Sequence, residues 1–305
     1  MLYERPPQFP LPDGWGFRVI VAIASLMRSF GALLAMFSVV TLVDFFYVPF
    51  MAFVPLPRDI GPSLLRAVPE VLICVPISWV LLRYGHSLSL RELGIHMGLG
   101  AFKEFALFTI AGAVSVSLVV LPLIALGLGA FRQSEARIQN PWIVLLCVLL
   151  LFLASCSEEL VMRGYAFQSL IQPLHLLGAL IATSSIFAVL HLWNPWASEY
   201  SIANTFLAGC VLGMILVVRR SLWAAVGAHF GWNTMTPFLG VNLSGMPLQI
   251  TGYSVEWRGD PTITGGGYGP EGSIVCTALL LILLFFLIWL YYRPKPIEAV
   301  AGEAV

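Results

Sequence analysis

The residues with the clearest chemical potential are Glu158, Glu159 and Arg163, which follow a long apolar run. In a helix, positions four apart share a face, so Glu159 and Arg163 are predicted to form an ion pair. Glu158 is rotated by about 100° from Glu159 and is free to face a different neighbour. Charged residues inside apolar segments are costly and usually functional. The alternative is that all three lie in water at a cytoplasmic helix end.

A histidine, His191, ends the segment Phe187–His191. A lone histidine near a helix end is most often an interfacial or packed residue. If the chain turns back at Gln172-Pro173, however, Glu158 lies about 14 residues before the turn and His191 about 18 after it. In antiparallel helices the two would lie within roughly 6 Å of the same depth. A carboxylate and an imidazole placed in this way can share a water molecule.

Two hydrogen-bonding side chains, His229 and Asn233, are four residues apart and are predicted to point the same way. Both can donate hydrogen bonds. Their small neighbours Gly227, Ala228 and Gly231 would allow another helix to approach closely. The alternative is that the pair only holds two helices together.

Taken together, these residues supply what hydrolysis of an acyl group requires. A carboxylate can act as the general base that activates water, and hydrogen-bond donors can stabilise the developing oxyanion. Motifs of competing chemistries are missing from the sequence: there is no H-E-x-x-H zinc motif, no Gly-x-Gly-Asp motif and no Gly-x-Ser-x-Gly elbow. The combination favours a carboxylate-based hydrolase.

The composition indicates that these residues lie in a membrane. The 305 residues have a mean hydropathy of +0.89, and 59% of them are hydrophobic. Only 10% are charged, against about 25% in soluble domains, so one soluble core could not bury the apolar excess. The net charge is zero, and no basic stripe suggests a nucleic-acid partner.

The apolar runs predict an all-α, polytopic membrane protein, because a bilayer-spanning helix needs about 20 apolar residues. We expect about eight transmembrane helices, at 29–54, 67–83, 104–128, 141–171, 174–194, 200–218, 221–240 and 274–292. The fourth is unusually long and turns polar after Leu153. Such a helix would protrude, tilt or line a wet cavity.

The basic residues predict the orientation. With eight spans, eleven of the sixteen Lys and Arg residues fall on one side, which places both termini in the cytoplasm. Residues 1–28 lack the features of a signal peptide and would form a cytoplasmic N-terminal segment. Residues 29–292 would form a single transmembrane catalytic domain, and residues 293–305 a cytoplasmic tail. The expected location is the cell (plasma) membrane.

These motifs resemble those of the CPBP family, the CAAX-protease and bacteriocin-processing (Abi) membrane proteins, which includes the Rce1-type prenyl-protein endopeptidases. The family pattern is E-E-x-x-x-R, F-x-x-x-H and H-x-x-x-N, read here as Glu158–Arg163, Phe187–His191 and His229–Asn233. Two further segments, Arg91–Ile95 and Thr264–Ser273, resemble the family less specifically. The core of the resemblance covers residues 140–275.

The resemblance implies an intramembrane endopeptidase acting on membrane-associated or lipidated proteins. Its catalytic residues would be Glu158, His191, His229 and Asn233. The glutamate would activate water with help from the first histidine, while the second histidine and the asparagine would bind the oxyanion. Glu159 and Arg163 would support them.

Two points stay open at this stage. No cofactor is required by this mechanism, but Glu158, His191 and His229 could also hold zinc. The alternatives to an enzyme are a catalytically silent membrane partner or immunity protein, and a small-solute transporter whose charged residues line a path. The sequence contains no inverted repeat, which argues against the transporter. The expected partners are the lipid bilayer and a membrane-associated protein or peptide substrate.

Overall fold

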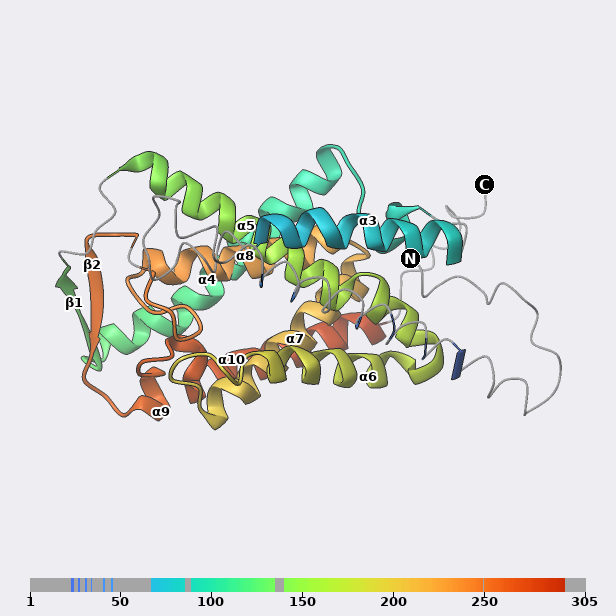
Figure 1. Cartoon of the computed structure of the whole chain (residues 1–305). Coiled ribbons are helices and arrows are strands. Elements are labelled where there is room, and N and C mark those ends of the chain that lie inside the picture. The colour runs from blue at the N-terminus through green and yellow to red at the C-terminus, as the bar shows by residue number, and fades with distance from the viewer. Residues whose placement is uncertain are drawn as a thin grey trace.

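The structure, a computed structural model, describes residues 67–85, 89–134, 140–248 and 250–293, together with isolated positions before residue 46. It is mostly helical (Figure 1). The long helices are α3 (Ala67–Gly85), α4 (Leu99–Ala125), α5 (Pro141–Arg163), α6 (Tyr165–Leu190), α7 (Glu199–Arg219), α8 (Leu222–Phe238) and α10 (Ile274–Tyr292). Shorter elements are η2 (Leu90–Leu93), β1 (Gly129–Gln133), β2 (Tyr253–Trp257), α9 (Pro261–Thr264) and η3 (Pro270–Gly272).

Within the described ranges, four helical segments are long and apolar enough to cross a membrane: Leu99–Ala125, Pro141–Leu190, Glu199–Arg219 and Ile274–Tyr292. They cover five of the predicted spans, because the second segment contains both α5 and α6. Helices α3 and α8 lie on two further predicted spans, and the predicted span 29–54 falls outside the described residues except for isolated positions. The multi-helix membrane architecture is therefore supported, while the number eight stays a prediction.

The long polar helix predicted at 141–171 is broken at Gly164. This residue has ψ −128° and separates α5 from α6. A Cβ atom at this position would lie 2.1 Å from the carbonyl oxygen of Leu160, so only glycine fits the break. The break predicted at Gln172-Pro173 lies two residues before a kink inside α6 at His175, which has φ 58°. Both deviations come from single backbone positions that apolar periodicity does not reveal.

The structure is mostly helical, in agreement with the predicted fold class, but β1 and β2 add a small antiparallel sheet that was not predicted, with Gly129 opposite Trp257. Strand β1 lies just after the predicted span 104–128, in the segment before the next predicted span at 141–171. Aromatic and β-branched residues favour strand structure, and such residues recur in β2 at Tyr253, Val255 and Trp257. Figure 1 shows the sheet at one end of the helices, close to α9.

Helix α8, which carries His229, packs directly against α4 through small residues. Added Cβ atoms at Gly227 and Gly231 would lie 2.4 and 2.0 Å from carbonyl oxygens of α4, those of Phe105 and Thr109. On the α4 side, a Cβ at Gly112 would lie 2.1 Å from the carbonyl oxygen of Ala228. The close helix approach predicted from the small residues of α8 is confirmed. It fixes the depth and rotation of α8 and hence of its polar side chains.

Candidate active site

The ion pair predicted on α5 is present and buried. Arg163 donates from Nη1 to Oε1 of Glu159 at 3.0 Å, and the two side chains are 1% and 0% exposed. Arg163 also donates from Nη2 to the carbonyl oxygen of Gly209 at 3.2 Å, and its Cζ lies 4.7 Å from the centroid of the Phe187 ring. The alternative that these charges lie in water at a helix end is wrong for Glu159 and Arg163. The pair ties α5 to α6 and α7.

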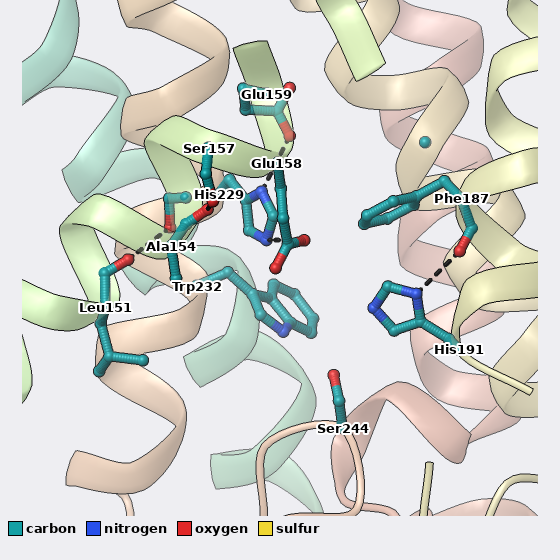
Figure 2. A network of polar contacts seen from close by, with 12 residues as sticks. Leu151, Ala154, Ser157, Glu158, Glu159, Phe187, His191, His229, Trp232 and Ser244 are labelled. Atoms are coloured by element: carbon teal, nitrogen blue, oxygen red, sulfur yellow. Dashed lines mark hydrogen bonds and ion pairs between the residues drawn. The ribbon is translucent and has the colours of Figure 1, made fainter. Parts of the chain in front are cut away.

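Glu158, one residue earlier, faces a different environment, as the helical rotation predicts. Its side chain is 37% exposed, and it lines a large cavity. Its Oε2 atom lies 3.7 Å from Nε2 of His229. Figure 2 shows the Glu158 carboxylate directed into open space beside this ring. Two adjacent glutamates therefore divide into a buried structural carboxylate and a carboxylate that a ligand can reach.

The imidazole of His229 lies between these two glutamates. Its Nδ1 atom is 2.9 Å from Oε1 of Glu159. A carboxylate can only accept a hydrogen bond, so Nδ1 carries the proton of the neutral ring and Nε2 is then an acceptor. The ring can donate from Nε2 toward Glu158 only when both nitrogens are protonated.

The other histidine, His191, lines the same cavity but is held by α6. Its Nδ1 donates to the carbonyl oxygen of Phe187 at 2.8 Å, which leaves Nε2 as an acceptor in the neutral ring. The Phe187 ring packs edge-on against both His191 and His229, with centroid separations of 4.6 and 6.2 Å. The sequence predicts that His191 lies at a depth similar to that of Glu158. In the structure the ring of His229 lies beside Glu158, and His191 lines the same cavity.

Asn233 lies one helical turn after His229 on α8, and both side chains line the cavity. The prediction that they point the same way is confirmed. Within the ranges that the structure describes, the Asn233 amide has no hydrogen-bond partner, and it is partly exposed. Its donor N–H groups are therefore available to a ligand in the cavity.

A second group of polar residues in the cavity wall was not predicted. Glu271 accepts hydrogen bonds from Nε1 of Trp232 at 3.0 Å, from the backbone N–H of Ser244 at 2.6 Å and from the Ser244 hydroxyl at 3.1 Å. All three residues line the cavity. Burial raises the pKa of Glu271, and these hydrogen bonds counteract that effect. In the sequence, this group could have been found only from the single carboxylate in the glycine-rich segment before the last apolar helix.

The cavity that joins these groups has a volume of about 930 Å³, which is within the size range of ligand pockets. Much of its wall is apolar, formed by α7 and α10 through residues such as Leu212, Ile215, Leu283 and Phe286. Its polar lining includes Glu158, His229, Ser244 and Glu271, and also the side chains of Arg219 and Arg293. An apolar segment with one polar reacting group, such as a peptide bond, matches this lining.

The three residues proposed as an alternative zinc site do not fit a metal ion as they stand. Among the described residues, no three His, Cys, Asp or Glu side chains lie close enough together to hold one. The Nδ1 atoms of His229 and His191 donate to Glu159 and to a backbone carbonyl, which leaves both Nε2 atoms free, as in zinc-binding histidines. The misfit is therefore one of distance between the three side chains.

Comparison with protein families gives one match. Residues 140–235 match the model of the family described as "Type II CAAX prenyl endopeptidase Rce1-like". The match begins at the N-cap of α5, contains all three motifs and ends two residues after Asn233. Comparison with curated proteins and with solved structures finds no match.

Proposed function

Residues 140–235 form a domain of the Rce1-like type II CAAX prenyl endopeptidase (CPBP/Abi) family, and from this premise we propose that the protein is an intramembrane endopeptidase. It would hydrolyse peptide bonds in membrane-associated or lipidated proteins. The observation that carries the proposal is the Glu158 carboxylate, which is open to a large cavity within an apolar helical protein and lies beside a histidine. A base in this position can activate a water molecule next to a bound peptide.

In the first step, Glu158 takes a proton from a water molecule in the cavity, and the water oxygen attacks the peptide carbonyl carbon. His191 assists by accepting a hydrogen bond from that water at Nε2, since its Nδ1 proton is committed to Phe187. Glu158 later returns the proton to the leaving amine. The same carboxylate thus serves first as base and then as acid.

The carbonyl oxygen becomes an oxyanion during this attack and needs donors. Asn233 provides an unoccupied amide in the cavity wall. His229 can add a second donor from Nε2 when its ring is protonated, with Glu159 holding Nδ1. Donors fixed in a site that excludes bulk water stabilise such a charge strongly. Glu159 and Arg163 support the site by fixing the ring and the helix.

Helices long and apolar enough to span a bilayer support a membrane location. We further propose a single multi-pass domain over residues 29–292 in the plasma membrane, with both termini in the cytoplasm. The lipid bilayer would be its permanent partner, and the substrate a membrane-associated protein or peptide.

The direct test compares the membrane proteomes of cells that produce the wild type and the Glu158→Ala variant at equal levels. We expect membrane-protein fragments that are present with the wild type and missing with the variant. Each candidate is then incubated with purified wild type in detergent. Identical fragment patterns in both strains, combined with no cleavage by the purified protein, would reject the protease. They would favour a silent partner or a transporter.

A further inference from the structure

The cavity contains a carboxylate, Glu271, that the proposed reaction does not use. It lies in η3, just before α10, at the polar end of the cavity. Its main-chain oxygen accepts a hydrogen bond from the Asn204 amide at 2.8 Å, which fixes the segment against α7. Its side chain is held by the indole N–H of Trp232 and by Ser244. The carboxylate is therefore held in one place by neutral groups.

What distinguishes Glu271 is that it has no ion-pair partner in contact, although the charge of His229 acts on it from a longer distance. Glu159 pairs with Arg163, and Glu158 faces His229. In the part of the chain that the structure describes, no Lys, Arg or His forms an ion pair with Glu271. A carboxylate in such a buried setting is expensive unless a cation accompanies it.

The two guanidinium groups that line the cavity, those of Arg219 and Arg293, lie too far from Glu271 to form an ion pair with it. Arg219 ends α7 and Arg293 follows α10, whereas Glu271 precedes α10. The 19 residues of α10 separate the two ends by roughly 28 Å. Arg219 already pairs with Glu104, and Arg293 lies over the Trp289 ring. Both guanidinium groups therefore lie at the opposite end of the cavity from Glu271.

The groups around Glu271 suit a cationic ligand. Trp232 lines the cavity and lies between the Glu158–His229 pair and Ser244 (Figure 2), and an aromatic face attracts cations. The hydroxyl of Tyr268 is buried beside Asn194, Thr205 and Ser244, which all line the cavity. Burial and the charge of Glu271 raise the pKa of Tyr268 to about 12. The hydroxyl therefore stays neutral beside Glu271.

We infer that Glu271, with the Trp232 ring and Ser244, forms a subsite for a cationic side chain, Lys or Arg, of the bound peptide segment. The inference rests on the proposed protease function and adds a requirement to it: the cleaved segment carries a basic residue near the scissile bond. The apolar wall of α7 and α10 would hold the rest of that segment. Because Glu271 and Glu158 line one cavity, one substrate can reach both.

The test uses synthetic apolar peptides in pairs that differ only in Lys or norleucine at one position, scanned along the sequence. Purified wild type, Glu271→Gln and Glu256→Gln are compared in detergent. At one position we expect kcat/KM to favour Lys about tenfold with the wild type. The preference should disappear in Glu271→Gln. It should persist in Glu256→Gln, because Glu256 is an exposed carboxylate on β2, paired with Arg132 outside the cavity.

A binding measurement separates this inference from the proposed function. Fluorescence anisotropy of the same labelled peptides is measured with Glu158→Gln and with the double variant Glu158→Gln/Glu271→Gln. The single variant should bind the Lys peptide more tightly, and the double variant should bind both peptides equally. If the wild type cleaves no peptide, the proposed protease function is rejected. The binding measurement still shows whether Glu271 recognises the Lys side chain.

Two results would overturn the subsite: no position at which Lys is preferred, or a preference that survives Glu271→Gln. Should Glu271→Gln fail to fold, dicyclohexylcarbodiimide labelling of wild-type carboxyl groups replaces it, with the labelled residue located by mass spectrometry. The Lys peptide should protect Glu271 more than the norleucine peptide does. Equal protection by both peptides would also overturn the inference.

Discussion

The two carboxylate regions of the cavity hold their charges in different ways. On α5 and α8, Glu159 is balanced by Arg163 and contacts His229. Before α10, Glu271 is held only by neutral donors from Trp232 and Ser244. Removing one partner of a buried ion pair leaves an uncompensated charge, whereas removing one of several neutral donors loses a single hydrogen bond. The first region should therefore be far more sensitive to substitution than the second.

Within the first region, the same contrast separates two neighbours in sequence. Glu159 is fully buried and pairs with Arg163, while Glu158 is 37% exposed to the cavity. The rotation of about 100° between adjacent helical positions therefore places one glutamate in the buried ion pair and the other in the cavity. Substitution of Glu158 should accordingly lower activity, whereas substitution of Glu159 should lower stability.

The largest effect is expected at Glu158. Glu158→Gln keeps the shape of the side chain and removes the basic oxygen, so peptide hydrolysis should fall by roughly 1,000-fold or more. Folding should be nearly unchanged, because this side chain makes no buried ion pair. The measurement is kcat/KM on a substrate found by proteomics, together with the melting temperature of the same sample. Activity within a few-fold of wild type would remove Glu158 from the role of base.

The next effect concerns the buried ion pair. Glu159→Ala and Arg163→Ala should each destabilise the protein by roughly 3–5 kcal/mol, because a lone charge remains buried. Thermal unfolding in detergent and membrane yield would report this loss. The matched control is Arg132→Ala, which breaks an exposed pair with Glu256 on the β1–β2 sheet and should melt like wild type. Equal melting of Arg163→Ala and wild type would show that the pair contributes little.

A smaller loss, confined to turnover, is expected at Asn233. Asn233→Ala should lower kcat by about 100- to 1,000-fold with little change in KM, because the oxyanion exists only in the transition state and nearby intermediates. His229→Ala should behave similarly, and the double variant should lose less than the sum, since donors that act together are not additive. A pure KM effect would make Asn233 a substrate-binding residue. Reduced stability at unchanged kcat would show that Asn233 only holds two helices together.

The contrast between the regions also explains what the sequence could predict. The Glu159–Arg163 pair and the shared face of His229 and Asn233 follow from helical spacing, which is a local property. The Glu271 contacts join residues 27 and 39 positions apart in sequence. They depend on irregular turns that no periodicity encodes.

The same limit explains two unpredicted features near the site. The break at Gly164 is a single backbone deviation. The position of His229 beside Glu158 was not predicted, while the placement of His191 close enough to share a water with Glu158 stays a prediction. The position of α8 depends on its glycine contacts with α4, which spacing alone does not locate.

In the second region, Ser244→Ala should have a modest effect that depends on pH. Burial raises the pKa of Glu271, so the folded protein binds that proton more tightly than the unfolded chain. The associated stability is present below the unfolded pKa and is lost as pH rises through the folded pKa. The Ser244 hydroxyl opposes this loss by favouring the ionised form. Removing it should cost about 1 kcal/mol at neutral pH and less in acid. A cost independent of pH, measured by unfolding at several pH values, would contradict this account.

The smallest effect is expected from metal removal. Zinc needs three or more protein ligands that converge on one point. In this cavity Nδ1 of His229 binds Glu159, and Nδ1 of His191 binds the carbonyl oxygen of Phe187. Only the Nε2 atoms and the Glu158 carboxylate remain, and they form no three-residue cluster. We therefore expect dialysis against a chelator to leave kcat/KM within about twofold, whereas loss of a catalytic zinc would abolish turnover.

Elemental analysis of the purified protein provides the independent measurement. One zinc per chain, with activity lost on chelation and restored by zinc, would show that His191 and His229 move together to bind a metal. The first region would then be a metal centre that Glu159 supports through His229, and the difference between the two carboxylate regions would be larger still.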